Sequence, residues 1–253
     1  MTALQVVYED EALLVLDKPS GLLSVPGKGD DKQDCLSARA QARHADARVV
    51  HRLDMATSGL MLMARGAAMQ RALSQAFASR KVNKRYAAVV AGEMLMPGPA
   101  IDPAPRSTPG STPDPTPCSP PDGWAVIDLP IALDWPNRPL RIINAEGGKQ
   151  SVTHWRTVPG EMPATQEPLL PEGTLQFDRS APFTRLELSP VTGRSHQLRV
   201  HLAALGHPVL GDTLYAPLAV QARARRLLLH ASRLTLAHPV TGQTFRFDSP
   251  PPF

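Results

Sequence analysis

Short apolar runs that end at turn-forming residues recur along this 253-residue chain, and they limit the folds open to it. The first two, within residues 4–21, flank an acidic turn at residues 9–11 and predict a β-hairpin. Similar strand-like runs follow at residues 48–54, 59–65, 84–93, 125–142, 149–158, 183–194 and 226–247. The sustained alternation of strands and helices that marks a parallel sheet does not appear. The pattern therefore predicts an α+β fold with a mixed, mostly antiparallel sheet.

Three segments carry helical signals. Residues 34–43 form a polar stretch that can hold one helix. Residues 67–81 predict an amphipathic helix whose basic last turn suits the helix dipole. Its apolar positions are Met69, Leu73, Ala76 and Phe77. Residues 195–205 predict a third helix, capped by Ser195 and ended by Gly206. The expected buried stripe of this helix consists of Leu198, Leu202 and Leu205.

Two segments are expected to be insertions in a single catalytic domain that spans residues 1–253. Residues 97–123 hold about ten of the chain's 27 prolines and almost no large apolar side chain. Such a segment cannot bury enough surface to offset the entropy of ordering it, so a flexible loop or a polyproline excursion is expected. A second Pro- and Glu-bearing loop is expected at residues 159–182.

Composition excludes several classes of protein. Hydrophobic residues make up 42% of the chain, and no apolar run approaches the roughly 18 residues that span a bilayer. The N-terminal residues lack the basic start and apolar core of a secretory signal. Cys35 and Cys118 lie far apart, which favours neither a disulfide framework nor a metal site. We therefore expect a soluble cytoplasmic protein that holds no metal.

The distribution of charge points to an anionic partner more strongly than the net charge of +4 does. Basic residues gather at residues 79–86, 193–201 and 223–230, whereas acidic residues gather near the N-terminus and at residues 161–178. Clusters of this kind favour a ligand lined with phosphates, such as nucleic acid. Solvated helix faces are the alternative explanation.

The stretch VVHRLDMATSGLMLMAR, at residues 49–65, places charged side chains at the lip of a predicted hairpin. A turn rich in hydroxyl groups follows, and Gly59 can supply a positive φ there. Charged groups beside a buried strand have to be paired or functional. The residues alone leave two interpretations open: a structural ion pair that involves Arg52, or a catalytic carboxylate at Asp54.

A second candidate site is the sequence GRSHQ at residues 193–197, where the last predicted helix begins. Free N–H groups at a helix start bind anions, and Arg194 would add a forked donor. This guanidinium could bind a phosphate or hold a nearby carboxylate ionised by lowering its pKa; a solvated Arg beside an ordinary cap is the alternative. The sequence contains no nucleophile elbow, no HExxH zinc motif and no P-loop, and His196 and His201 share no helix face.

Four motifs, in this order, resemble the RluA family of pseudouridine synthases: HRLDMATSG, KRYAAVVAGE, GRSHQLRVHLAALGHPVLGD and LLLHA. The resemblance covers nearly the whole chain apart from the two expected insertions. DKPSGLLSVPG and DLPIALDWPNRP further resemble members with dual specificity for ribosomal and transfer RNA, and no RNA-binding S4 domain is expected before residue 4. The resemblance implies a pseudouridine synthase fold, in which a central RNA-binding cleft splits the sheet and helices flank it.

The resemblance also implies an isomerisation of uridine to pseudouridine in RNA, without a cofactor. Asp54 matches the family's catalytic carboxylate, which acts at the sugar either as a nucleophile or by assisting formation of a glycal. Arg194 matches the partner of this carboxylate. Tyr86 matches the tyrosine that stacks on the uracil and takes part in the proton transfer at C5. A non-catalytic RNA-binding or ribosome assembly factor is the alternative on the same scaffold.

The substrate implied is a stem-loop of the large-subunit rRNA, the tRNA anticodon loop, or both, bound by a monomer. The target nucleotide must be flipped out of its stack, at a cost of roughly a few kcal/mol, and Arg52 is expected to occupy the vacated place. Basic residues 80–85 and 223–226 are expected to track phosphates. The other expected contacts are His51, Lys84, Arg85, His196, Gln197, Arg199 and Leu229, the last packing beside the catalytic pocket.

Overall fold

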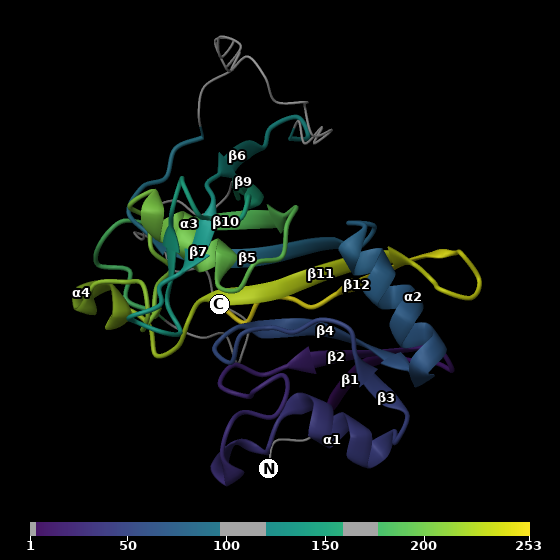
Figure 1. Ribbon diagram of the computed structural model, residues 1–253. Helices are drawn as coiled ribbons and strands as arrows, with labels where there is room; N and C mark the ends of the chain where they lie inside the picture. Colours follow the sequence, from purple (N-terminus) through teal and green to yellow (C-terminus); the bar gives the residue numbers. More distant parts are fainter. Residues whose placement is uncertain (1–3, 97–119, 159–176) are drawn as a thin grey trace.

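Strands dominate the computed structural model of the protein, which describes residues 4–96, 120–158 and 177–253 (Figure 1). The strands are β1 (Gln5–Glu9), β2 (Leu13–Lys18), β3 (Ala47–Val49), β4 (Ser58–Arg65), β5 (Asn83–Ala91), β6 (Ala125–Asp128), β7 (Ile131–Leu133), β8 (Arg141–Ile143), β9 (Val152–Thr157), β10 (Phe183–Pro190), β11 (Leu229–Ala237) and β12 (Thr244–Asp248). The helices are α1 (Leu36–Arg43), α2 (Gly66–Ala78), α3 (Gln197–Ala204) and the short α4 (Leu218–Gln221), with a 3-10 turn at Asp30–Lys32. Most of the two expected insertions, at residues 97–123 and 159–182, lies outside the described residues.

One ten-stranded sheet organises the described part of the chain, with the main order β1-β2-β4-β11-β5-β10-β9-β6. β3 pairs with β4, β12 pairs with β11, and β7 and β8 form a small sheet of their own. The pairing of β4 with β11 is parallel, whereas the other described pairings are antiparallel. The predicted α+β fold with a mixed, mostly antiparallel sheet is therefore confirmed.

The apolar run of β4 is continuous because both faces of this strand are covered. Leu60 and Leu62 belong to the cluster that also holds Leu73 of α2. Met61 and Met63, which alternate with them, pack in the cluster that holds Leu36 of α1. Successive side chains of a strand point to opposite faces, so a strand between two helices needs apolar residues at every position.

A seam at the centre of the sheet forms where β4 and β11 run parallel. Two residue pairs make this contact, His230 with Ser58 and Ala231 with Gly59. Gly59 has a φ of +104°, and a Cβ atom on it would lie 2.4 Å from the carbonyl oxygen of Ala231. The two backbones thus approach so closely that a side chain at this position has no room.

A buried chain of hydrogen bonds reinforces the seam. His230 Nδ1 lies 2.9 Å from Ser58 Oγ, and its Nε2 lies 3.0 Å from Ser249 Oγ. The Ser249 hydroxyl in turn donates to the Asp17 carboxylate of β2. Burial lowers the pKa of His230, which favours the neutral imidazole, able to donate from one nitrogen and accept at the other. The network therefore ties β2, β4, β11 and the C-terminal segment together.

The first predicted hairpin and the closing pair of strands are confirmed, but the hairpin at residues 48–65 differs from the prediction. β3 ends at Val49, and residues 50–57 form a loop that returns the chain to β4. The charged motif therefore lies on a loop and not on a strand. The reason is that β3 pairs with the C-terminal end of β4, where Val49 lies opposite Met63. Residues 50–57 must therefore cover the distance from Met63 to the start of β4 at Ser58.

Two helix ends also differ from the predictions. α2 ends at Ala78, so Arg80 and Lys81 follow the helix, and its last turn contains no basic residue. The expected Ser195 cap is wrong, because α3 begins at Gln197 after His196, which has a left-handed backbone and makes no side-chain cap. Leu205 lies at the end of α3 and is 41% exposed, so the buried stripe of this helix is shorter than predicted.

Gly59→Ala is expected to destabilise the fold by roughly 3 kcal/mol or more, because the new Cβ atom would collide with the backbone of β11. Gly242→Ala is the matched control, since Gly242 also has a positive φ, +72°, but no atom lies within 4 Å of its Cβ position. The control should lose only about 1 kcal/mol. Urea unfolding of the two variants measures the difference, and equal losses would contradict a tight seam.

Candidate active site

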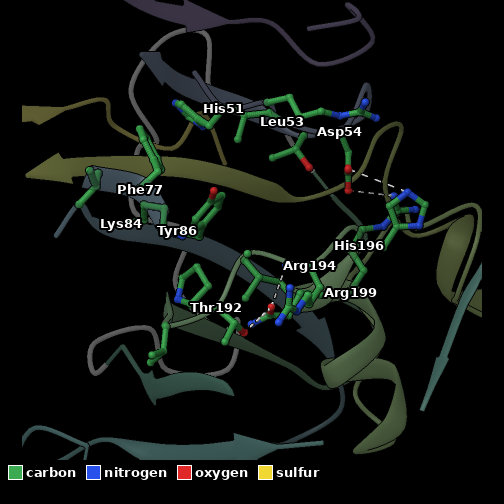
Figure 2. A pocket seen from close by; sticks show the side chains of 18 of the residues that line it. His51, Leu53, Asp54, Phe77, Lys84, Tyr86, Thr192, Arg194, His196 and Arg199 are labelled. Atoms are coloured by element: carbon green, nitrogen blue, oxygen red, sulfur yellow. Dashed lines mark hydrogen bonds and ion pairs between the residues drawn. The ribbon is translucent and has the colours of Figure 1, made fainter. Parts of the chain in front are cut away.

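A pocket of about 500 Å³ lies beside the β4–β11 seam. Its walls come from segments that are distant in the sequence: the loop at residues 50–57, the end of α2, β5, the residues after β10, the start of α3, and Leu229 of β11. Figure 2 shows their side chains converging on one space. The fold therefore brings all four sequence motifs to one pocket. The motif LLLHA contributes Leu229 alone.

Asp54 lies in the pocket wall, on the loop that leads into the seam. The N–H of Thr57 donates to the carbonyl of Asp54 at 3.1 Å, which closes a turn and directs the carboxylate into the pocket. The side chain of Asp54 is 24% exposed. In Figure 2 the carboxylate faces His196 and Arg199, across the pocket from the loop.

Lys18, at the end of β2, is fully buried beneath this loop. Its ammonium group donates to the backbone carbonyls of Pro19 at 2.9 Å, Leu22 at 2.8 Å and Met55 at 3.0 Å. Burial lowers the pKa of Lys18 to about 8, against the opposing effect of the Asp54 carboxylate. Lys18 therefore fixes the backbone directly after Asp54. Lys18 was not among the predicted site residues, although a Lys at the end of an apolar strand is a usable signal in the sequence.

Arg199 is the guanidinium that reaches Asp54 among the described residues. It is 3% exposed, and its Nη1 lies 3.7 Å from Asp54 Oδ2. A buried carboxylate, Asp212, holds the same guanidinium through two hydrogen bonds, the first of them from Nε at 2.8 Å. The N–H groups of Leu214 and Tyr215 donate to Asp212 in turn. Arg199, which was predicted to contact RNA, is therefore a buried and preoriented cation next to Asp54 in the structure.

The prediction that Arg194 is the partner of Asp54 is wrong. Arg194 lines the pocket but is exposed, and its Nε donates to the carbonyl of Gln150 at 3.4 Å. The two arginines are five positions apart, so the start of α3 turns them in different directions. The motif contains both, and the sequence alone could not tell which one lies within reach of Asp54.

His196 also lies close to the Asp54 carboxylate, with Nε2 3.9 Å from Oδ1. Its Nδ1 lies 2.7 Å from the hydroxyl of Tyr215, which fixes the ring. Burial lowers the pKa of His196, so the neutral imidazole is favoured at pH 7. The predicted RNA contact is thus located at the carboxylate itself.

Tyr86 of β5 lines the pocket together with Asp54. Burial, with a smaller contribution from the Asp54 carboxylate, raises the pKa of its phenol. The phenol therefore stays protonated at neutral pH. Its ring gives the pocket an aromatic wall that can stack on a planar ligand.

His51 belongs to the loop at residues 50–57 and fixes it from inside the pocket wall. Its Nε2 accepts the N–H of Leu62 at 2.9 Å, and its ring stacks on Phe77 with centroids 4.5 Å apart. Burial, together with the charge of Lys84, lowers the pKa of His51 to about 3. The imidazole is therefore neutral, and it occupies a hydrogen-bonding position of β4 that no strand covers there.

Gln197 was predicted to contact RNA; it lies in the pocket wall, and its amide makes hydrogen bonds within the protein. Its amide oxygen accepts from Thr192 Oγ1 at 2.7 Å and from Arg194 N at 3.0 Å. Its amide nitrogen donates to the Val152 carbonyl and to Thr153 Oγ1, both at 3.0 Å. All donors and acceptors of the buried amide are thus used, so Gln197 locks the start of α3 against β9.

The two basic neighbours on β5 point to opposite faces of the sheet. Lys84 lines the pocket, and burial lowers its pKa. Arg85 lies on the other face, where Nη1 is 3.4 Å from Glu187 Oε1 and Cζ is 4.2 Å from the centre of the Trp124 ring. Because side chains alternate along a strand, Arg85 points away from the pocket, and its predicted RNA contact is outside the pocket.

The basic cluster at residues 223–226 is partly structural. Arg223 is 8% exposed and donates to the backbone carbonyls of Asp178, Ala181 and Pro182. It therefore fastens the segment before β10, and the prediction that it tracks phosphates is wrong. Arg52, by contrast, is exposed at the pocket lip, as a residue that enters RNA must be.

The described residues contain no cluster of three or more side chains that could ligate a metal. In the same part of the chain, no helix is long and apolar enough to cross a membrane. Of the two cysteines, Cys35 is buried and free, whereas Cys118 lies outside the described residues.

The stability of the protein is expected to depend on His51 below neutral pH. The folded-state pKa is about 3 and the unfolded one about 6.5, so below pH 6.5 the unfolded chain binds the additional proton. The free energy of unfolding should therefore fall as the pH drops from 6.5 towards 3, with roughly 2 kcal/mol lost from this group by pH 5. Urea unfolding from pH 7 to pH 5 tests this against His51→Gln, which keeps an acceptor for Leu62 but does not titrate. Parallel curves for the two proteins would contradict the assignment.

Comparisons with known proteins identify the family of this chain. Residues 12–204 match the family model described as RNA pseudouridylate synthase. The chain is 40% identical over 250 residues to the dual-specificity RNA pseudouridine synthase RluA of Escherichia coli K12, covering 99% of this chain and 94% of that protein. It is 38% identical over 242 residues to the protein of the same name from Yersinia pestis, covering 96% of each.

Solved structures give the same result. Human RNA pseudouridylate synthase domain containing 1 superposes with a TM-score of 0.67 at 25% identity, covering 99% of this chain and 84% of the other. Human RNA pseudouridylate synthase domain containing 4 shares the fold, with a TM-score of 0.61 at 22% identity over 97% and 88% of the two chains. The family predicted from the four motifs is thereby confirmed. This chain belongs to the RluA family of RNA pseudouridine synthases.

Proposed function

We propose that this protein flips one uridine out of an RNA stem-loop into the pocket and isomerises it to pseudouridine, with Asp54 as the catalytic carboxylate. The observation that carries the assignment is the position of Asp54, which faces a buried guanidinium and shares one pocket with the aromatic ring of Tyr86. The relatives named as dual-specificity enzymes support more than one RNA substrate, and from the motif resemblance we assign one large-subunit rRNA loop and the tRNA anticodon loop. We assign the activity to a monomer in the cytoplasm.

The reaction breaks the bond between C1′ of the ribose and N1 of uracil, and joins C1′ to C5. A carboxylate beside the sugar can attack C1′ or assist loss of the 2′ proton, and Asp54 is suited to either role. The charges of Arg199 and Lys18 stabilise the negative charge on this side of the pocket. Because Asp212 already holds the Arg199 guanidinium, little reorganisation is needed when the substrate arrives.

Tyr86 acts on the base. Its ring can stack on the flipped uracil and hold it while the base turns. Its phenol, which the raised pKa keeps protonated, can accept the C5 proton on its oxygen while it gives its own hydrogen to a water molecule, and N1 of the turned base takes a proton from water in exchange. The proposal thus gives the sugar chemistry to Asp54 and the base chemistry to Tyr86.

Arg52, Lys84 and Arg194 are the cations that we assign to RNA. Arg52 is exposed on the loop two positions before Asp54, and its side chain can occupy the place that the flipped base leaves. Lys84 and Arg194 line the pocket, where they can bind the phosphates beside the target uridine. His51 and Leu229 complete the walls around the base.

Asp54→Asn is expected to abolish pseudouridine formation, since it keeps the shape of the side chain but removes the charge. Affinity for the RNA stem-loop should change by less than about threefold, because Asp54 supplies no attraction for phosphate. Mapping pseudouridines in rRNA and tRNA, from cells that carry either the wild type or the variant, measures the activity. Pseudouridine formation by the variant would contradict the assignment of Asp54 as the catalytic carboxylate. RNA binding without pseudouridine formation by the wild type would favour the non-catalytic alternative.

Arg199→Lys should lower kcat by about 10²- to 10³-fold with a smaller change in KM, because Lys keeps the charge but not the fork that binds Asp212. Arg194→Lys is the matched control, and it should stay within about threefold of the wild-type kcat. Steady-state kinetics on a stem-loop RNA compares the two variants. A larger loss in the Arg194 variant would reverse the assignment of the Asp54 partner.

A further inference from the structure

Tyr215, a half-buried residue between α3 and α4, contacts two of the side chains that face the Asp54 carboxylate. Its hydroxyl lies 2.7 Å from His196 Nδ1, and the two rings meet edge to face with centroids 5.7 Å apart. Its ring lies against the Arg199 guanidinium, with Cζ 5.2 Å from the ring centre. Tyr215 is not one of the residues that line the pocket, so any effect on the substrate must pass through these neighbours.

The hydroxyl of Tyr215 has one hydrogen, and its surroundings direct that hydrogen to His196. The backbone N–H of Arg141 donates to the hydroxyl oxygen at 2.9 Å. Burial raises the pKa of Tyr215, so the phenol keeps its hydrogen at neutral pH. His196 Nδ1 is the acceptor that the described residues offer to this hydrogen. The phenol therefore donates to Nδ1, and a neutral imidazole that accepts at Nδ1 carries its own hydrogen on Nε2.

The Asp54 carboxylate favours the same tautomer from the other side of the ring. His196 Nε2 lies 3.9 Å from Asp54 Oδ1. An ionised carboxylate only accepts hydrogen bonds, so it attracts an N–H on Nε2 and repels a lone pair there. Burial lowers the pKa of His196, which keeps the ring neutral at pH 7. Tyr215 and Asp54 thus select one form of the imidazole, with its N–H directed into the pocket.

The backbone of His196 adds to this positioning. Its φ is +58°, in the left-handed region that side chains other than glycine rarely adopt. Such a conformation persists where its surroundings require it, and it is frequent at functional sites. The side chain of His196 is only 13% exposed. The ring is therefore fixed by its backbone, by burial and by the Tyr215 hydroxyl before any substrate binds.

The space between His196 and Asp54 suits a hydroxyl group. The 3.9 Å between Nε2 and Oδ1 is too long for a direct hydrogen bond. An oxygen atom can lie about 2.8 Å from both atoms, accept from the Nε2–H and donate to the carboxylate. The proposed reaction brings C1′ of the ribose to Asp54, and the 2′ hydroxyl is on the neighbouring carbon. This hydroxyl both donates and accepts, and DNA lacks it.

We propose that Tyr215 is a positioning residue that fixes His196 with its hydrogen on Nε2, and that this N–H binds the 2′ hydroxyl of the target uridine beside Asp54. The inference rests on the proposed function, since it names the part of the substrate that the same pocket recognises. A ribose held in this way keeps C1′ and C2′ within reach of the carboxylate. With a deoxyribose the N–H would lose its partner, so His196 contributes to the choice of RNA over DNA.

The tautomer of His196 can be observed directly by NMR. A long-range proton–nitrogen correlation spectrum of the isotope-labelled protein at pH 7 should show His196 protonated on Nε2 and not on Nδ1. In Tyr215→Phe, which keeps the ring but not the hydroxyl, the His196 signals should move towards a mixture of tautomers. His201 is the internal control, because its Nε2 lies 3.0 Å from the Leu129 carbonyl, which only accepts. A wild-type His196 protonated on Nδ1, or signals that the variant leaves unchanged, would overturn the proposal.

Steady-state kinetics on a stem-loop RNA measures what the hydroxyl contributes. Tyr215→Phe should lower kcat/KM about 3- to 10-fold, the effect of one lost hydrogen bond. Tyr8→Phe is the matched control, since the Tyr8 hydroxyl also makes a hydrogen bond, to Asp10, but lies on β1 away from the pocket. The control should stay within about twofold of the wild type. Equal losses in the two variants would contradict a specific role of Tyr215.

His196→Asn tests whether Tyr215 acts through the imidazole. Asn tolerates a left-handed backbone, and its amide can meet the Tyr215 hydroxyl as Nδ1 does, but it is too short to replace Nε2. The variant should lower kcat/KM about 3- to 30-fold. Adding Tyr215→Phe to it should cause no further loss, because both changes remove the same contact with the substrate. A second loss as large as that in the wild-type background would show that Tyr215 acts by another route.

A stem-loop with 2′-deoxyuridine at the target position identifies the group that His196 binds. The wild type should bind the RNA form about 3- to 10-fold more tightly than the deoxy form. In His196→Asn the two dissociation constants should agree within about twofold. Equal affinities in the wild type, or the same ratio in the variant, would refute the contact with the 2′ hydroxyl.

These outcomes differ from a failure of the proposed function. The tautomer and the dissociation constants need no turnover, so they still decide the role of His196 if the wild type forms no pseudouridine. Full turnover by a wild type whose His196 is protonated on Nδ1 would refute this inference and leave the catalytic assignment intact. Thermal unfolding of Tyr215→Phe and His196→Asn, expected within a few degrees of the wild type, excludes a loss through misfolding.

Discussion

The parallel seam between β4 and β11 is the contact on which the rest of the structure depends. It joins the N-terminal strands to the rest of the sheet through two residue pairs, and it closes only because Gly59 has no side chain. The loop that carries Asp54 leads directly into it, and Leu229 enters the pocket from its other strand. A shift of the seam would therefore move the carboxylate and the pocket wall together, which explains why a buried network of Ser58, His230 and Ser249 reinforces it.

Around Asp54 the protein uses buried cations that are themselves held by other groups. The ammonium group of Lys18 donates to backbone carbonyls, and the guanidinium of Arg199 donates to the Asp212 carboxylate. Each cation is thus held in a fixed position, from which its positive charge stabilises the Asp54 carboxylate. Such preorganisation is more effective than flexible surface charges, since the field at the reacting atoms exists before the substrate binds. Arg52 and Arg194 are exposed at the same pocket, where we propose that they contact RNA.

Much of this site could be predicted from residue types and motif order, and the errors have a common physical origin. Asp54, Tyr86 and Leu229 lie in the pocket as the motifs indicated. Arg194 was taken as the partner of Asp54 because both arginines belong to one short motif, in which Arg199 lies within α3 and Arg194 precedes the helix. The positions of the two basic residues on β5 were not predicted for a similar reason. Side chains alternate along a strand, so Lys84 faces the pocket and Arg85 points away from it.

The sequence by itself determined the family and the α+β class, since these follow from the order of the apolar runs and from short motifs, and it singled out Asp54 as the carboxylate that we propose to be reactive. Only the tertiary structure decided which cation faces Asp54, which polar side chains are consumed in holding the fold, and that the Tyr215 hydroxyl meets His196 beside this carboxylate. These properties depend on the distances between side chains of separate elements. Such distances arise from packing and strand pairing across the whole chain, and no local stretch of sequence encodes them.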